Sequence, residues 1–132
     1  MAYAAWTKGT AALLLATRAL ARAEGVEDAL VAEWALSQPG LADRSRGAAR
    51  SATTKGWRWV AEMEEIAASM AAAGLPDGFH QAAAEIFRRS PRAEPDQPDH
   101  RTDGADGADG ADGADGTVDR VLSAIAGEAL RS

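Results

Sequence analysis

The sequence contains no cysteine, few aromatic residues and no long apolar segment. Without cysteine, disulfide bonds and thiol chemistry are excluded, and a reducing, cytoplasmic location is the simplest expectation. Trp, Tyr and Phe together supply 5% of the 132 residues, which fit one small domain. No apolar run approaches the roughly 20 residues of a membrane-spanning helix, so we expect no membrane partner.

Alanine occupies 33 of the 132 positions. Because alanine favours helices but buries little apolar area, the 46% hydrophobic share overstates the size of the core. The large apolar residues cluster before Phe87, so we expect the core to form in that part of the chain. The composition and the helical spacings described below predict an all-α fold, a compact bundle of about five helices.

Charge divides the chain into two parts. Residues 1–92 carry a net charge of +1 and residues 93–132 carry −7, which gives the total of −6. A nearly neutral domain lacks the basic surface that nucleic acids attract, so we expect no nucleic-acid partner. We assign residues 1–92 to a helical domain and residues 93–116 to an acidic linker.

The linker is rich in proline and then repeats Asp-Gly-Ala with a period of three residues. A repeat without aliphatic residues cannot form a core, so we expect a disordered spacer. Thr117 can then cap a last helix within residues 117–132. Such a short helix is marginal alone, so we expect it to dock on the domain or on a partner. Its apolar side comprises Val118, Val121, Leu122 and Ile125.

A tight helical hairpin is predicted between residues 57 and 89, where apolar residues recur at helical spacing. Gly74 is a typical helix end, Pro76 prevents the helix from continuing, and Asp77 can cap the next helix. Together with tryptophans from the two preceding helices, the predicted core comprises Trp6, Trp34, Trp59, Met63, Ile66, Met70, Phe79, Ile86 and Phe87.

Residues 3–24 are predicted to form the first helix and residues 27–37 the second. The first helix carries two neighbouring stripes. Its larger side chains form a heptad-like seam of Tyr3, Trp6, Thr10, Leu13, Thr17 and Leu20. Its smaller residues form a stripe of Ala5, Gly9, Ala12, Ala16, Ala19 and Ala23. Small residues at this spacing allow another helix to approach closely.

Basic residues gather between positions 44 and 58, and two interpretations of them stay open. They are Arg44, Arg46, Arg50, Lys55 and Arg58. Arginine side chains of this kind can hold a phosphate or a carboxylate. Alternatively, the residues form a solvated helical face with local ion pairs at i, i+4 spacing.

No set of residues has the spacing of a metal site. Glu62 and Glu65 share a helical face, but no histidine lies near them in sequence. His80 and His100 have no second His or Cys at ligand spacing. We therefore predict no metal ligand.

Two stretches of the sequence form a recognisable pattern. The first helix begins Ala2-Tyr3-Ala4-Ala5-Trp6-Thr7-Lys8-Gly9. The hairpin reads Trp57-Arg58-Trp59-Val60-x-Glu62-Met63-x-Glu65-Ile66, then Gly74-Leu75-Pro76 and Phe79-His80-x-Ala82-Ala83. Over residues 1–92 this pattern resembles the C-terminal helical domain of a group of NAD(P)-dependent oxidoreductases. That group is related to 6-phosphogluconate dehydrogenase and to the 3-hydroxyisobutyrate (β-hydroxyacid) dehydrogenases.

The resemblance implies a two-part enzyme in which a Rossmann domain binds NAD(P). The helical domain would close the substrate cleft and build a homodimer. The family's acid–base lysine would precede Met1, so no catalytic residue is transferred to this chain. The histidine and asparagine that follow that lysine would fall at Tyr3 and Ala4, which do not match. The substrate-side candidates are Tyr3, Thr7 and Lys8.

The sequence has no G-x-G-x-x-G turn of the kind that binds dinucleotides. Because hydride transfer needs a bound nicotinamide, we expect this chain alone to bind no cofactor and to be inactive. The absence of a capping residue before Tyr3 fits a frayed N-terminus or a chain cut inside a longer helix. Together with the family lysine that would precede Met1, it suggests a detached or mis-started C-terminal half, whose partner would be a separate Rossmann-type domain.

Two hypotheses for function follow. In the first, the chain is the substrate-side and dimerisation domain of an NAD(P)-dependent oxidoreductase. In the second, it is a stand-alone helical module without catalysis, which homodimerises through the first helix or through the tryptophan face.

Overall fold

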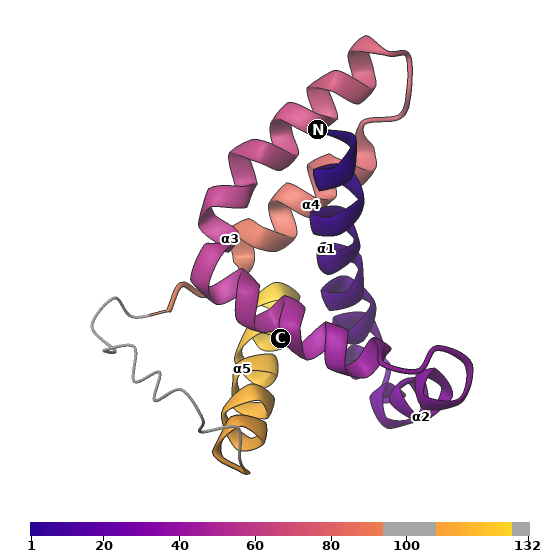
Figure 1. Ribbon diagram of the computed structural model, residues 1–132, viewed down its shortest axis with the longest axis vertical. Helices are drawn as coiled ribbons and strands as arrows, with labels where there is room; N and C mark the ends of the chain where they lie inside the picture. Colours follow the sequence, from indigo (N-terminus) through magenta and orange to yellow (C-terminus); the bar gives the residue numbers. More distant parts are fainter. Residues whose placement is uncertain (94–107, 128–132) are drawn as a thin grey trace.

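A computed structural model describes residues 1–93 and 108–127, and all of its regular structure is helical (Figure 1). The helices are α1 (Ala2–Ala23), α2 (Glu27–Ser37), α3 (Leu41–Ala72), α4 (Gly78–Arg89) and α5 (Ala108–Ala126). The all-α prediction is therefore confirmed. α3 is the longest helix, and α1, α4 and α5 all pack against it. None of the helices described combines the length and the apolarity that crossing a bilayer requires.

Two helices end at a glycine, as the sequence predicts for Gly74. Gly74 follows α3 with a φ of +78°, and Leu75 N–H donates to the Met70 carbonyl at 2.8 Å. Gly25 follows α1 with a φ of +74°, and Val26 N–H donates to the Ala21 carbonyl at 2.8 Å. These left-handed glycines and reaching-back hydrogen bonds turn the chain sharply without leaving the last carbonyls unsatisfied.

The first helix of the hairpin is much longer than the apolar pattern from Trp57 predicts, because α3 begins at Leu41. Its first half is held by small residues, since Ala48, Ala49 and Ala52 are buried. Alanine leaves no strong apolar signal in the sequence, although it packs well where two helices cross closely. Arg44 and Arg50 remain exposed, as expected of a solvated face.

Most of the predicted core lies inside the molecule. Trp34, Met63, Ile66 and Phe87 are buried, and Trp59, Met70 and Ile86 are partly buried against them. The Trp59 and Phe87 rings meet edge to face, with centroids 5.1 Å apart, and so join α3 to α4.

The core prediction is wrong for Trp6 and Phe79, whose exposed fractions are 69% and 78%. The reason is which of the two neighbouring stripes of α1 packs against the other helices. The small-residue stripe faces the fold, and Ala12 and Ala19 on it are buried. The larger residues of the neighbouring seam consequently point outward. α4 presents its Phe87 face to α3, which leaves Phe79 on its outer side.

α5 docks on the same chain. Its residues Val118, Val121, Leu122 and Ile125 are buried within the common core. The helix begins at Ala108, not at Thr117, so the predicted start is wrong. The remainder of the predicted spacer, residues 94–107, lies outside the described residues.

Candidate functional site

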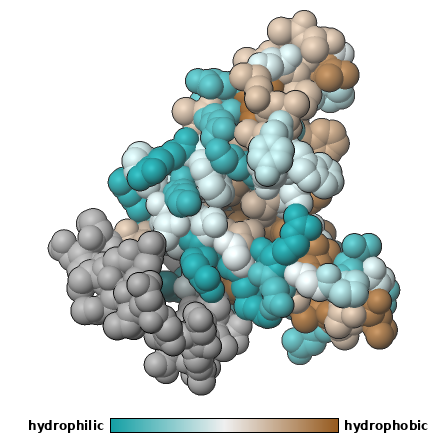
Figure 2. Space-filling view, in the orientation of Figure 1, coloured by the Kyte–Doolittle hydropathy of each residue, from teal (hydrophilic) through white to brown (hydrophobic). Residues whose placement is uncertain are grey.

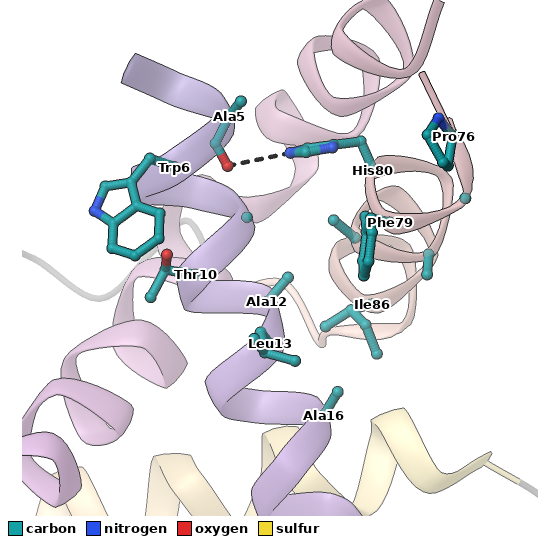
Figure 3. A pocket seen from close by; sticks show the side chains of 14 residues that line it. Ala5, Trp6, Thr10, Ala12, Leu13, Ala16, Pro76, Phe79, His80 and Ile86 are labelled. Carbon is teal, nitrogen blue, oxygen red and sulfur yellow. Dashed lines mark hydrogen bonds between the residues drawn. The ribbon is translucent and has the colours of Figure 1, made fainter. Parts of the chain in front are cut away.

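An open apolar groove of about 700 Å³ runs between α1 and α4 (Figure 3). α1 contributes the side chains of Trp6, Thr10 and Leu13 together with small residues. α4 and the turn before it contribute Phe79 and Ile86, with Pro76 at the upper end. A concave, largely apolar surface of this kind is typical of sites that bind a ligand or another protein.

The groove forms because α1 and α4 approach closely at one point. A Cβ atom on Gly9 would lie 3.1 Å from Nε2 of His80, which is closer than ordinary packing allows. Because Gly9 has no side chain, the imidazole of His80 can pack directly against the α1 backbone. Below this contact the two helices diverge, and larger side chains line the space between them (Figure 3).

His80 fixes the upper end of the groove. Its side chain is 8% exposed, and Nε2 lies 3.1 Å from the carbonyl oxygen of Ala5 (Figure 3). Because a carbonyl can only accept, Nε2 must carry the proton, and Nδ1 is then an acceptor in the neutral ring. Nδ1 is buried and has no hydrogen-bond partner among the described residues.

The groove continues into an exposed apolar surface along α1. Besides Trp6, the seam residues Tyr3, Leu13 and Leu20 have exposed fractions of 80%, 65% and 58%. Figure 2 shows hydrophobic colours where α1 meets α2, in contrast to the mostly hydrophilic colours along the lower part of α3. Large apolar side chains that cluster on one exposed face are typical of interaction surfaces, whereas single exposed apolar residues are not.

The three substrate-side candidates are not brought together in this groove. Tyr3 is exposed, and its carbonyl accepts a hydrogen bond from Thr7 Oγ1 at 3.1 Å. Lys8 forms an ion pair with Glu62, and its ammonium lies 5.3 Å from the centre of the Trp59 ring. Lys8 thus faces α3, on the side of α1 opposite the apolar groove.

The most extensive polar cluster of the described residues joins four helices. Glu27 of α2 accepts hydrogen bonds from Arg18 and Arg22 of α1. Arg18 also donates to Ser45 of α3 at 2.9 Å, and Arg22 to Asp119 of α5 at 2.8 Å. Burial raises the pKa of the Glu27 carboxyl, but the hydrogen bonds from the two arginines outweigh it and the pKa is lowered. The cluster connects elements and does not reach the groove.

The described residues offer no set of side chains that could bind a metal ion. Among residues 1–93 and 108–127, no group of three or more His, Cys, Asp or Glu side chains could hold an ion. His100 lies outside the described residues.

Residues 21–90 match a family profile described as "Domain of unknown function (DUF1932)". The chain belongs to this family. The DUF1932 match spans α2, α3 and α4 with the end of α1, and therefore includes His80 and Phe79 of the groove. Trp6, Thr7 and Lys8 precede the matched residues. No curated protein and no solved structure matches the DUF1932 chain.

Two features of this DUF1932 chain escaped the sequence reasoning. The contact between His80 and the α1 backbone was missed, although Gly9 within the small-residue stripe was a signal for a close approach. The cluster around Glu27 was also missed. Arg18 and Arg22 at i, i+4 spacing, followed by an acidic helix start, were the usable signal.

Proposed function

We propose that this chain is the dimerisation and substrate-side domain of an NAD(P)-dependent oxidoreductase, of the kind related to 6-phosphogluconate and 3-hydroxyisobutyrate dehydrogenases. The motifs of the hairpin and of the first helix support the enzyme class. The apolar groove between α1 and α4 carries the dimerisation part of the proposal. Homodimerisation through this groove would cover Trp6 and Phe79, two aromatic side chains of the type that anchors protein interfaces.

The described residues do not fit a dinucleotide. A Rossmann site needs parallel strands and a glycine-rich turn from a strand into a helix. Residues 1–93 and 108–127 contain helices and connecting turns only. We therefore assign NAD(P) to a partner Rossmann domain and derive no catalytic step within this chain. On this proposal the helical domain supplies apolar surface and positioning, and the chain alone is inactive.

The exposed apolar groove also supports a second candidate function, because both candidates would use this groove to form a homodimer. A stand-alone helical module that homodimerises without any nucleotide would also cover Trp6 and Phe79. The two candidates share the dimer and differ in whether a nucleotide-binding partner is needed for function. They therefore need two separate experiments.

The first experiment measures molar mass by light scattering over a hundredfold range of chain concentration. We expect a dimer for the natural chain and a monomer for Trp6→Asp and for Phe79→Asp, because a buried carboxylate in an apolar interface is strongly disfavoured. Leu36→Asp is the matched control, since Leu36 is 82% exposed on α2 and does not line the groove. A natural chain that stays monomeric at every concentration would contradict the dimerisation proposal.

The second experiment measures binding of NAD⁺ and NADP⁺ to the chain by calorimetry, first alone and then with a purified Rossmann domain of a related dehydrogenase. Nucleotide bound by the chain alone would refute the assignment to a partner domain. Hydroxyacid oxidation that appears only in the mixture supports the oxidoreductase. A stable dimer that never confers activity on a Rossmann domain favours the stand-alone module.

A further inference from the structure

A second groove, of about 320 Å³, lies between α1 and the first half of α3. It is lined by Thr7 and Lys8 of α1 and by Arg44, Gly47, Ser51 and Trp59 of α3, together with three apolar residues. We infer that this groove binds a small oxyanion, a phosphate or a carboxylate. The structure thereby connects Lys8 with Arg44, which lies in the arginine segment whose role the sequence left open.

Lys8 is held in place at one side of this groove. Its ammonium contacts the Glu62 carboxylate and the face of Trp59, and its side chain is 26% exposed. An ammonium group has three donors, so those not used by Glu62 remain available to an anion. Glu62 offsets part of the positive charge, and a bound anion therefore needs a second cation.

Arg44 provides that second cation. It is exposed, and its guanidinium has no ion pair or side-chain hydrogen bond within the part of the chain that the structure describes. A guanidinium presents a rigid fork of donors that matches a carboxylate or a phosphate. Ser51 lies two turns further along the same helix and lines the groove with a hydroxyl that can donate to the same anion.

Gly47 keeps the groove open. It lies inside α3, where glycine weakens a helix, yet a Cβ atom built on it would meet no atom within 4 Å. Neighbouring side chains therefore do not require glycine at this position, unlike at Gly9. Gly47 is thus a helical glycine that packing does not require, and it lines the groove together with Lys8 and Arg44. This supports a role for Gly47 in leaving room for a bound anion.

The anion groove is independent of the proposed dimer. On α1, Thr7, Lys8 and Ala11 face this groove, whereas Trp6, Gly9 and Leu13 face the apolar one. At 100° per residue these two sets lie on opposite sides of the helix. A failure of either proposal therefore leaves the other standing.

The test is a titration of ¹⁵N-labelled full chain with potassium phosphate and, separately, with potassium acetate, followed by NMR at pH 7. Potassium chloride keeps the ionic strength constant, so that general screening does not move the signals. We expect saturable shifts of the Lys8, Gly47 and Ser51 amides and of the Trp59 indole. Saturation by phosphate alone identifies a phosphate site, and saturation by acetate as well identifies a general carboxylate and phosphate site.

Three variants make the test specific. Arg44→Gln should raise the Kd about tenfold, the loss expected for one charged hydrogen-bonding partner. Arg46→Gln is the matched control because it removes the same charge from the same helix, but Arg46 pairs with Asp43 and does not line the groove. Gly47→Leu changes no charge and should abolish binding by filling the space.

Two outcomes would overturn the inference. The first is the absence of saturable shifts with either anion. The second is an equal weakening by Arg44→Gln and Arg46→Gln, which would show that only the overall charge of the helix attracts the anion. Unfolding midpoints that are no lower than that of the natural chain would establish that the fold is intact in each comparison.

Discussion

Two helical glycines, Gly9 and Gly47, differ in what surrounds the position of a side chain. At Gly9 a Cβ atom would lie 3.1 Å from His80 Nε2, whereas at Gly47 it would meet nothing within 4 Å. Gly9→Leu should therefore lower the free energy of unfolding by about 1–3 kcal/mol through overpacking. Gly47→Leu should raise it by about 0.5–1 kcal/mol, because leucine is the better helix former.

Urea denaturation of the two variants checks this prediction, since the same substitution is made at two helical positions in one protein. The expected result is a pair of midpoints on opposite sides of that of the natural chain. Equal destabilisation by both variants would show that the contact between Gly9 and His80 has no special importance.

Met63 is fully buried where α3 meets the other helices. Met63→Ala should lower the free energy of unfolding by about 2–5 kcal/mol, because it removes apolar contacts and leaves a cavity. The control is Leu36→Ala, at a position 82% exposed, which should change stability by no more than about 0.5 kcal/mol. Both values come from denaturant unfolding, and an unchanged midpoint for Met63→Ala would contradict its place in the core.

The sequence predicted residues such as Met63, Ile66 and Phe87 because large apolar side chains recur there at helical spacing. It failed for Trp6, because two adjacent stripes of α1 were both compatible with burial. Which stripe faces the fold depends on how closely α4 approaches, and that depends on the Gly9 contact with His80. Distance between helices is a tertiary property that periodicity does not contain.

Among the helices, the cluster around Glu27 holds α2 against α1 through Arg18 and Arg22. Glu27→Gln should lower the free energy of unfolding at pH 7 by about 1–3 kcal/mol, because charged hydrogen bonds are lost and two arginines remain. Glu64→Gln removes an exposed partner of Arg88 and should have little or no effect.

The effect of Glu27 should depend on pH in a defined direction. The pKa of its carboxyl is lowered in the folded chain from an ordinary value of 4.5. Its stabilisation is therefore complete above pH 4.5 and is lost as the pH falls through the folded-state pKa. Unfolding free energies of the natural chain and of Glu27→Gln, measured from pH 7 to pH 3, should converge at the acidic end. A difference that stays constant over this range would show that the carboxylate charge is not involved.

The bounds of the helices were predictable to different degrees. α2 spans Glu27–Ser37, as predicted, because the helix-breaking residues Gly25 and Pro39-Gly40 lie before and after it in the sequence. The start of α3 at Leu41 was missed because alanines and arginines give no apolar period there. Burial of those alanines stabilises the helical segment, and Arg44 of this segment lines the same groove as Lys8. The second groove could therefore not have been found from sequence spacing alone.

At the scale of the whole molecule, packing of the described helices buries the small residues and the apolar side of α5, but it leaves the large seam of α1 and Phe79 exposed. If a second copy covers this surface, dimerisation must stabilise the fold by mass action. A hundredfold rise in concentration adds about 2.7 kcal/mol to a coupled dimer, so Tm should increase by several degrees. Phe79→Asp should remove this dependence on concentration, and Leu36→Asp should retain it. Calorimetric scans of the three proteins over that range decide the matter, since a Tm independent of concentration in the natural chain would mean that the exposed aromatic residues serve a different partner.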